Sequence, residues 1–284
     1  MWRQTAGSVM CPSCGQLVGV NDTQCLSCGR RNPGLWGFAA LLRNVGDDMG
    51  FAQLVMFACG GLYIACLAVD FEGVSMNGLL SALSPSLASL FQFGASGRVP
   101  VFRYGRWWTV LSAAWLHAGL LHIVFNMMYM RDLVPVVAHL YGGARTVIIY
   151  TIAGVAGFTA SSAAVLIPVL PRLLAGAGFT VGASAPIFGL IGALVWYGRR
   201  GGSSLISEHA KRMALGGFVF GFLMPGIDNW AHLGGFLGGY LAARFLDPLK
   251  PERGDHVVIA LACLALSAAS ILVSVVTGRL ILSR

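Results

Sequence analysis

The chain has 284 residues, of which 56% are apolar and only 11% are charged. A typical soluble domain has about 25% charged residues, so this composition excludes a secreted enzyme, a disordered chain and a nucleic-acid binder with a basic surface patch. The mean hydropathy is +0.74. Because a membrane-spanning helix needs about 20 apolar residues, the chain has room for six or seven such helices. Its 38 glycines, nearly twice the usual share of about 7%, predict a closely packed helix bundle.

A polar N-terminal region precedes the predicted membrane helices. The first 50 residues contain no long apolar run, and we expect no secretory signal peptide there. Seven candidate spans follow, at residues 51–69, 108–130, 147–167, 183–197, 213–227, 231–245 and 257–276. The fourth to sixth spans are short and rich in glycine, and a bundle interior accommodates such segments better than lipid does. We expect part of the long loop 70–107, which contains several aromatic residues, to lie at the membrane interface.

The positions of the basic residues predict the orientation of the chain in the membrane. With a cytosolic N-terminus, the inner segments hold thirteen Lys and Arg residues and the outer segments hold six. This distribution follows the positive-inside rule, so the net charge of +8 needs no nucleic-acid partner to explain it. We therefore expect an integral, multi-pass protein of the plasma membrane or the bacterial inner membrane, with the lipid bilayer as its solvent and no nucleic-acid partner.

Four of the seven cysteines form two C-x2-C pairs: Cys11 and Cys14, then Cys25 and Cys28. A glycine follows each pair, which suits the tight turn that lets two thiolates reach one ion. Four thiolates favour a structural Zn²⁺ site, and the spacing resembles a zinc ribbon or knuckle. Two disulfides are the alternative, which a reducing cytosol disfavours. We expect a cytosolic zinc-ribbon-like module at 1–35 that binds a cytosolic partner or regulates the protein, and a linker at 36–50.

Several polar residues fall inside the predicted spans, where an ionisable group costs roughly 2.5 kcal/mol or more. His122 and Asn126 are four residues apart and share one helix face. His117 lies five residues before His122, so we expect it to point elsewhere. Ser184 and His232 lie near the starts of the fourth and sixth spans. Since even-numbered spans enter from the outer face, these groups could meet at one depth, although each could instead form hydrogen bonds between helices or within its own helix.

Three motifs in separate spans make the sequence resemble the rhomboid family of intramembrane serine proteases over residues 85–245. They are His117-x4-His122-x3-Asn126, then Gly182-Ala183-Ser184 with Phe188, and Ala231-His232-x2-Gly235-x3-Gly239. The resemblance implies an all-α polytopic fold with a six-helix core at 51–246. The segment 247–284 would then add a C-terminal loop and a seventh helix.

The family works through a Ser–His dyad, and the resemblance assigns roles to the matching residues. Ser184 would attack the scissile carbonyl, and His232 would take its proton and later give it to the leaving amine. His122, Asn126 and the backbone N–H of Ser184 would stabilise the oxyanion. Gly182 would let the chain turn and approach the substrate closely. No cofactor is implied for catalysis, and the implied substrates are transmembrane proteins that enter beside the fifth span and are cut near the outer face.

The resemblance also assigns a role to Phe188, which would pack on the imidazole of the dyad. Two departures from the family pattern are visible. The residue after the nucleophile is Ala185 rather than glycine, and Pro186 follows it, so the amide at position 186 has no N–H to offer an oxyanion. The family's Trp-Arg pair in the first outer loop corresponds here to Trp108-Thr109, which concerns the conformation of that loop rather than the chemistry.

Three alternatives remain at this point. Asp228 lies four residues before His232 and could complete a triad, although we expect a solvated loop residue instead. The alternative function is a catalytically silent rhomboid-like protein that binds membrane proteins or controls their quality. The presence of both Ser184 and His232 argues against that function. A transporter is a third reading, but paired intramembrane acids and inverted repeats are not visible in the sequence.

Overall fold

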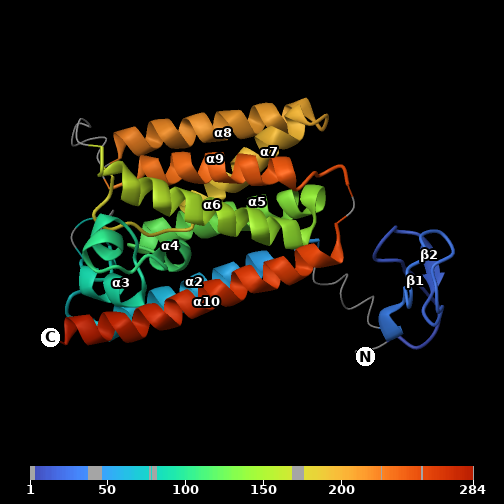
Figure 1. The fold of residues 1–284 in the computed structure, drawn as a ribbon, viewed down its shortest axis with the longest axis horizontal. Helices are drawn as coiled ribbons and strands as arrows, with labels where there is room; N and C mark the ends of the chain where they lie inside the picture. The colour runs from blue at the N-terminus through green and yellow to red at the C-terminus, as the bar shows by residue number, and fades with distance from the viewer. Residues whose placement is uncertain are drawn as a thin grey trace. The chain divides into compact units, whose positions relative to one another are not determined.

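The computed structural model describes residues 4–37, 47–76, 78, 82–167, 176–224, 226–250 and 252–283. The chain divides into two compact units, Met1–Gly50 and Phe51–Arg284, and the second unit holds the helices of Figure 1. Four of the Lys and Arg residues that predict the orientation in the membrane lie outside the described residues: Arg3, Arg43, Arg172 and Arg284.

The N-terminal unit contains a two-stranded antiparallel sheet. Strand β1 (Ser8–Met10) pairs with β2 (Leu17–Gly19), and Val9 lies opposite Val18. A single 3-10 turn, η1 (Leu35–Gly37), follows. The small core consists of valines and cysteines: Val9, Cys11, Val18, Val20 and Cys25. Because a unit of this size buries little apolar surface, it needs a further source of stability such as a metal ion.

Seven long helices form the second unit within the part of the chain that the structure describes. They are α2 (Phe51–Val69), α5 (Leu120–Tyr141), α6 (Gly143–Ala164), α7 (Ser184–Arg199), α8 (Ser204–Leu223), α9 (Asn229–Phe245) and α10 (Gly254–Leu282). Four of them, α2, α5, α6 and α10, are long and apolar enough to cross a membrane. In the described part of the connection between α2 and α5 lie the short elements α3 (Leu87–Phe93), the π-helical turn η3 (Val99–Arg103), α4 (Thr109–Ser112) and the 3-10 turn η4 (Ala113–Trp115).

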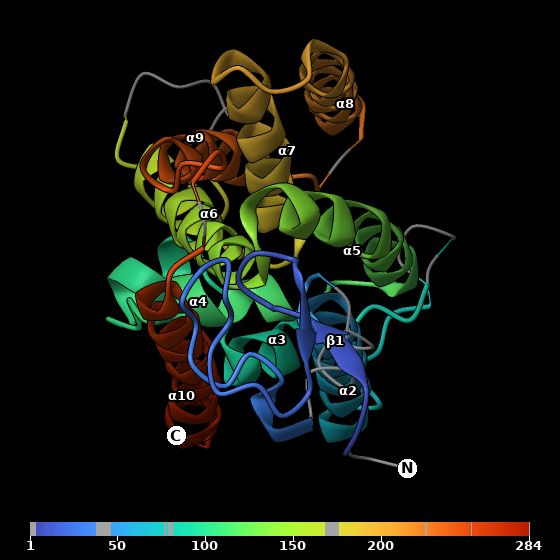
Figure 2. The same cartoon turned by 90° about the vertical axis from the view of Figure 1, so that its right-hand side faces the viewer.

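Helices α6, α7 and α9 form the centre of this unit. Helix α9 packs extensively against both α6 and α7, and the three lie side by side along the bundle and when seen close to end-on (Figures 1 and 2). A Cβ atom on Gly235 would overlap the carbonyl oxygen of Ala185, and one on Gly239 would overlap that of Gly189. Gly235 and Gly239 therefore permit close packing of α7 and α9, in agreement with the closely packed bundle that the glycine content predicts.

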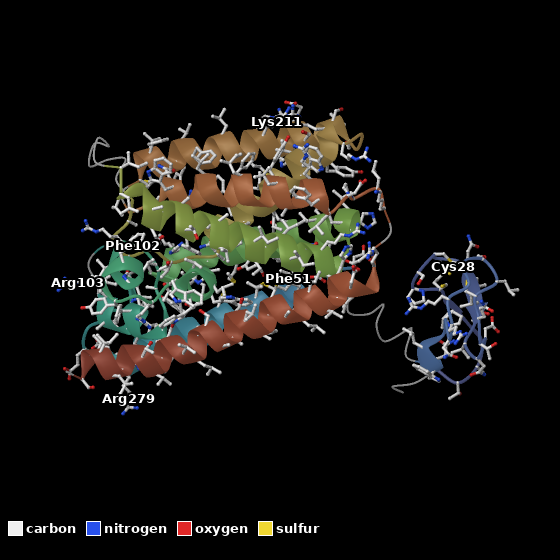
Figure 3. All side chains as sticks on the ribbon, viewed as in Figure 1. Cys28, Phe51, Phe102, Arg103, Lys211 and Arg279 are labelled. Carbon is white, nitrogen blue, oxygen red and sulfur yellow. The ribbon has the colours of Figure 1, made fainter. Side chains whose placement is uncertain are left out.

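The remaining helices surround this centre. Helix α8 packs mainly on α7, and α10 packs on α3, α4 and α6. In the long loop before α5, the side chain of Phe102 is 52% exposed. Figure 3 shows Phe102 and Arg103 toward the same end of the helical unit as Arg279 near the end of α10. Exposed aromatic and basic side chains at a bundle end are typical of a membrane interface.

The predicted first span coincides with α2, but the prediction of one continuous second span at 108–130 is wrong. The chain forms α4 and η4, turns extended at Leu116 (ψ 155°), and begins α5 only at Leu120. Gly119, which precedes α5, is also extended, with φ 170° and ψ 168°. The sequence stays apolar through this break, so hydropathy alone does not reveal it.

Two helices extend past their predicted ends into segments that contain charged residues. Helix α5 continues past Met130 to Tyr141 and accommodates the charged Arg131 and Asp132, because both side chains are exposed. Helix α8 begins at Ser204 rather than near residue 213, since the Ser203 side chain accepts a hydrogen bond from the Ile206 backbone N–H. The first turns of α8 are polar and therefore fell outside the apolar window.

Candidate active site

Ser184 and His232 meet at the starts of two central helices. Ser184 is the first residue of α7, and His232 lies in the first turn of α9. The Ser184 Oγ and His232 Nε2 atoms are 3.0 Å apart, a hydrogen-bond distance. Since the first N–H groups of a helix have no partner within the helix, the backbone N–H of Ser184 can serve a ligand at this point. The positive end of the helix dipole favours negative charge at the same place.

The imidazole of His232 is enclosed and oriented. His232 is 7% exposed, and the Phe188 ring stacks on it with centroids 4.2 Å apart and planes inclined by 14°. The expected packing of Phe188 is therefore observed. If Nε2 accepts the Ser184 hydroxyl proton, the neutral ring carries its own proton on Nδ1. That atom has no hydrogen-bond partner among the described residues.

The Asp228 side chain bonds to the start of α9 and to α6, and Asp228 meets His232 only through the backbone, where its carbonyl oxygen accepts from the His232 N–H at 3.1 Å. Asp228 is the N-cap of α9, where its carboxylate accepts a hydrogen bond from the backbone N–H of Ala231 at 3.0 Å. It also accepts one from the Ser161 hydroxyl of α6. As expected, Asp228 lies in the segment before α9 and its carboxylate does not bond to the His232 ring, but this carboxylate is held by the helix start and by α6 rather than by solvent alone. Among the described residues, Ser184 and His232 therefore form a pair without an acidic third partner.

His122 faces the chain just before Ser184. Its Nδ1 accepts a hydrogen bond from the Ala118 backbone N–H at 3.3 Å, which assigns the proton of the neutral ring to Nε2. A Cβ atom on Gly182 would lie 2.7 Å from this Nε2. Gly182 also has a φ of +133°, a conformation that glycine adopts readily and other residues rarely do. Position 182 therefore requires glycine for two reasons, the backbone conformation and the contact with the ring.

Asn126 supplies a second donor on the same face of α5. It lies one helical turn after His122, is 5% exposed, and has no hydrogen-bond partner for Nδ2 among the described residues. Leaving a buried donor unpaired costs about 1–3 kcal/mol. Such a group in a folded protein calls for an explanation, and a role toward a ligand is one.

His117 does not point away from this region, as the sequence led us to expect. It is 1% exposed, and its ring centroid is 5.2 Å from that of His122. The expectation assumed a helix through both residues. Because α5 begins only at Leu120, helical spacing does not apply to His117.

Sequence reasoning also missed Arg106, which it counted only as a charge of an outer loop. Arg106 is 1% exposed, and its guanidinium donates to the backbone oxygens of Phe91 and Ser274, each at 2.7 Å. One feature of the sequence could have indicated its burial: Arg106 stands directly before Trp107 and Trp108, at the border of an apolar segment. An arginine there is more easily buried than one in a polar loop.

The four cysteines of the N-terminal unit form a separate candidate metal centre. Their sulfur atoms all lie within 4.8 Å of one another, and all four cysteines are free. The Sγ atoms of Cys11 and Cys28 are 3.7 Å apart, and those of Cys14 and Cys25 are 3.6 Å apart. A backbone hydrogen bond from Cys28 lowers the pKa of the Cys25 thiol to about 7, which favours the thiolate that binds metals. The cluster can hold one metal ion.

Comparison with known proteins identifies the class. The family model for the Rhomboid domain matches residues 104–248. Over 210 residues the chain is 30% identical to Rhomboid protease GluP of Bacillus subtilis (strain 168). This match covers 72% of this chain and 38% of that protein. It is 31% identical to RHOMBOID-like protein 1 of Arabidopsis thaliana over 194 residues, 65% of this chain and 45% of that protein.

A third relative gives the same result. RHOMBOID-like protein 6, mitochondrial, of Arabidopsis thaliana is 30% identical over 183 residues, 61% of this chain and 54% of that protein. The chain therefore belongs to the rhomboid family, and with its long apolar helices it is an integral, multi-pass membrane protein. The matches span between 38% and 54% of the length of these three relatives.

Proposed function

We propose that this rhomboid is an intramembrane serine endopeptidase that hydrolyses peptide bonds in or near transmembrane segments of membrane proteins. The observation that carries the proposal is the distance of 3.0 Å between Ser184 Oγ and His232 Nε2. In addition, the buried Nδ2 donor of Asn126 on α5 has no hydrogen-bond partner among the described residues. The geometry supports nucleophilic catalysis by a hydroxyl with an adjacent base. The printed names of the relatives, which include a rhomboid protease, agree with this chemistry.

In the first half of the reaction, Ser184 Oγ forms a bond to the scissile carbonyl carbon while His232 Nε2 takes the hydroxyl proton. The C–N bond then breaks, and the leaving amine receives that proton, which yields an acyl-enzyme ester. In the second half, water attacks the ester as His232 takes its proton, and the Ser184 oxygen leaves and is reprotonated. General acid–base assistance of this kind contributes about 10²–10⁴ in rate.

The developing oxyanion would be stabilised by three N–H groups. These are His122 Nε2–H, Asn126 Nδ2–H and the backbone N–H of Ser184, of which the last benefits from the start of α7. Removal of one such donor typically lowers kcat about 10²–10³-fold. Gly182 keeps the backbone close to His122, so the carbonyl oxygen can approach the donors without meeting a side chain.

The imidazolium that forms during each proton transfer would rest on an aromatic face instead of a carboxylate. Phe188 stacks on the His232 ring at 4.2 Å, and a cation over an aromatic face gains about 0.5–2 kcal/mol. This contact supports a dyad that works without an acidic third member.

The substrates would be transmembrane proteins that enter beside α8 and are cut near the outer face. Helix α8 packs mainly on α7, and it buries only small residues: Ser207, Ala210, Ala214 and Gly221. A Cβ atom on Gly217 would lie 2.5 Å from the Phe188 ring, so α8 passes directly beside the dyad. Because the fully buried residues of α8 are all small and its larger apolar side chains are only partly buried, its displacement costs less than that of a deeply buried helix.

The N-terminal unit would hold a structural Zn²⁺ in the cytosol. A tetrahedral site with Zn–S bonds of about 2.3 Å places the sulfurs about 3.8 Å apart. The distances of 3.7 Å between Cys11 and Cys28 and 3.6 Å between Cys14 and Cys25 fit this geometry. The ion would stabilise the small unit, which would then bind a cytosolic partner or regulate the protein.

Labelling with a fluorophosphonate, which reacts with activated serines, tests the proposed function. The wild type should be labelled, and Ser184→Ala and His232→Ala should not. Equal labelling of all three proteins would contradict the protease function and favour the catalytically silent binding protein.

A further inference from the structure

Helix α10 holds the segment before α5 through one face. Ser270, Ser274 and Gly278 are spaced four apart, so they share that face. The Ser270 hydroxyl donates to the Trp108 carbonyl oxygen at 2.7 Å, and the Trp108 Nε1–H donates to the Ser274 hydroxyl at 3.1 Å. A Cβ atom on Gly278 would lie 2.6 Å from Cα of Gln92 in α3. These contacts are specific in direction, and both hydrogen bonds between membrane helices and close approach at small residues are known to hold such helices together.

Arg106 strengthens the same junction. Its guanidinium donates to the Ser274 carbonyl oxygen of α10 and to the Phe91 carbonyl oxygen of α3, and its Cζ lies 4.2 Å from the centroid of the Phe91 ring. Burying a guanidinium costs several kcal/mol unless its donors are used. The buried Nε of Arg106 has no partner among the described residues, so part of this cost remains at the place where α3, α4 and α10 meet. A role beyond anchoring α10 would explain why.

From this junction the chain leads directly to the nucleophile. Thr109 donates from its hydroxyl to the Arg106 carbonyl oxygen at 2.8 Å, and α4 and η4 follow without a break. The carbonyl oxygen of Ala113 in η4 accepts a hydrogen bond from the backbone N–H of Gly182 at 2.9 Å. Gly182 is two residues before Ser184. The short unit 106–115 therefore contacts α10 at one end and the Ser184 loop at the other.

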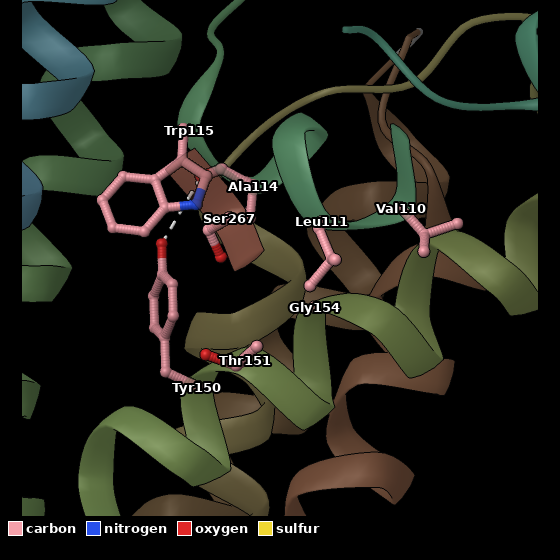
Figure 4. A pocket seen from close by; sticks show the side chains of 8 residues that line it. All are labelled: Val110, Leu111, Ala114, Trp115, Tyr150, Thr151, Gly154 and Ser267. Carbon is pink, nitrogen blue, oxygen red and sulfur yellow. Dashed lines mark hydrogen bonds between the residues drawn. The ribbon is translucent and has the colours of Figure 1, made fainter. Parts of the chain in front are cut away.

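Helix α6 closes the same unit from a third side. The Tyr150 hydroxyl donates to the Ala114 carbonyl oxygen at 3.4 Å. Figure 4 shows Tyr150 and Ser267 of α10 facing Ala114 and Trp115 of η4 around a small cavity of about 10 Å³, the size of one water molecule. A unit enclosed by α6 and α10 has few ways to move, so a shift of α10 would be passed on to Ala113.

We propose that α10 is a positioning element for the nucleophile, acting through Arg106 and Trp108 on the Gly182–Ser184 backbone. The inference rests on the proposed function, because it assigns to the seventh helix the task of holding Ser184 in its reactive geometry. Arg106, Ser270 and Ser274 are positioning residues, since none of them touches Ser184 or His232. A misplacement of about 1 Å at a reacting group can lower a rate 10²-fold.

The test uses the full chain in detergent or vesicles and a fluorophosphonate in excess. The Ser270→Ala/Ser274→Ala double variant removes the two side-chain contacts to Trp108, and Arg106→Gln removes the charged fork. Arg106→Lys keeps the charge but not the planar fork that reaches two carbonyl oxygens. Thr277→Ala is the matched control, because among the described residues its hydroxyl bonds only within α10, to the Val273 and Ser274 carbonyl oxygens.

Two readouts separate positioning from folding. The final labelled fraction reports how much protein is folded, and the labelling rate constant reports the geometry of Ser184. We expect the serine double variant to keep the wild-type labelled fraction while its rate constant falls 5- to 20-fold. Arg106→Gln should fall at least as far, Arg106→Lys should fall to an intermediate rate constant, and Thr277→Ala should match the wild type. For a cleaved substrate, kcat should fall by the same factor with KM within twofold.

The outcomes distinguish this inference from the proposed function. A wild type that is not labelled at Ser184 overturns the proposed function and this inference together. A labelled wild type with unchanged rate constants in the serine and arginine variants overturns this inference alone. Variants that lose labelled fraction but react at the wild-type rate constant also overturn it, because α10 would then serve only the fold.

Discussion

At the scale of single residues, the His232 ring is held on two sides. Phe188 stacks on its face at 4.2 Å, and Ser184 approaches its edge at 3.0 Å. The ring nitrogen on the other edge has no partner among the described residues. In a catalytic triad a carboxylate orients the histidine ring, whereas here the packing of Phe188 orients it. A dyad and a triad should therefore respond differently when a nearby carboxylate is replaced.

Replacement of Asp228 distinguishes these cases. Asp228→Asn keeps an oxygen that can accept from the Ala231 N–H, so we expect kcat within about fivefold of the wild type. The loss of a triad carboxylate typically lowers kcat about 10⁴-fold. Asp228→Ala, which removes the cap, should lower the free energy of unfolding by about 1 kcal/mol. A 10⁴-fold loss in Asp228→Asn, measured by substrate cleavage, would show that Asp228 acts in a triad.

Asn126 should show a conflict between stability and activity. Its Nδ2 donor is buried without a partner, so Asn126→Leu, of similar shape, removes an unpaired group and should raise the free energy of unfolding by about 1 kcal/mol. The same change removes an oxyanion donor, so kcat should fall about 10²–10³-fold with KM little changed. Thermal unfolding and cleavage kinetics on one preparation measure both. An unchanged kcat would exclude Asn126 from the oxyanion site.

Residue-level prediction from the sequence depended on motif spacing. The spacing and the parity of the spans led to Ser184 and His232 as residues that could meet, and the structure places them at 3.0 Å. His117 and Arg106 were misjudged because their surroundings depend on a helix break and on contacts with α10. The unpaired state of Asn126 Nδ2 depends on neighbours from distant parts of the chain, so no local pattern could predict it.

At the scale of elements, apolar composition located the helices better than it located their ends. Helix α2 matched its predicted span, whereas α5 and α8 each differed by several residues at one or both ends. Hydropathy reports the environment of side chains and carries little information on backbone direction. The extended segment around Leu116 and Gly119 stays apolar while it leaves the helix. That segment gives His117 its place beside His122.

Two glycines of α6 offer a matched test of helix packing. A Cβ atom on Gly154 would lie 3.6 Å from Ala114, an ordinary contact. Gly154→Ala should raise the free energy of unfolding by about 0.5–1 kcal/mol, because alanine restricts the unfolded chain. On Gly157, a Cβ atom would lie 2.5 Å from the Ala231 oxygen. Gly157→Ala should therefore destabilise the protein by about 1–3 kcal/mol.

Thermal unfolding in detergent measures both variants. Because Ala231 precedes His232, Gly157→Ala should also lower activity, while Gly154→Ala should not. Equal shifts of the unfolding temperature in the two variants would contradict the packing described between α6 and α9.

At the scale of the whole molecule, the chain combines a small cysteine unit with a helical membrane unit. Among its described residues, the first unit has a core of only a few side chains. A metal ion bound by its four cysteine sulfurs would supply stability that such a core lacks. The second unit carries the candidate active site. Composition alone distinguished these two units, because charge and apolar content differ so strongly between them.

Metal content tests the first unit. The full-length protein should contain about one zinc ion per chain, and a Cys11→Ser/Cys25→Ser variant should contain almost none. Cys263→Ala is the control, since Cys263 lies in α10 and is remote in sequence from the cluster; it should keep its zinc. Elemental analysis after gel filtration gives the ratio. A wild type without metal, or zinc retained in the double variant, would contradict the proposed zinc site.

The most direct test of the central claim is cleavage of a single-span membrane protein by the reconstituted enzyme in lipid vesicles. We expect two fragments whose masses place the cut near the outer end of the span, and an intact substrate with Ser184→Ala or with His232→Ala. Cleavage that persists in Ser184→Ala would contradict the claim. So would an uncut set of single-span substrates with a wild type whose Ser184 reacts fully with fluorophosphonate.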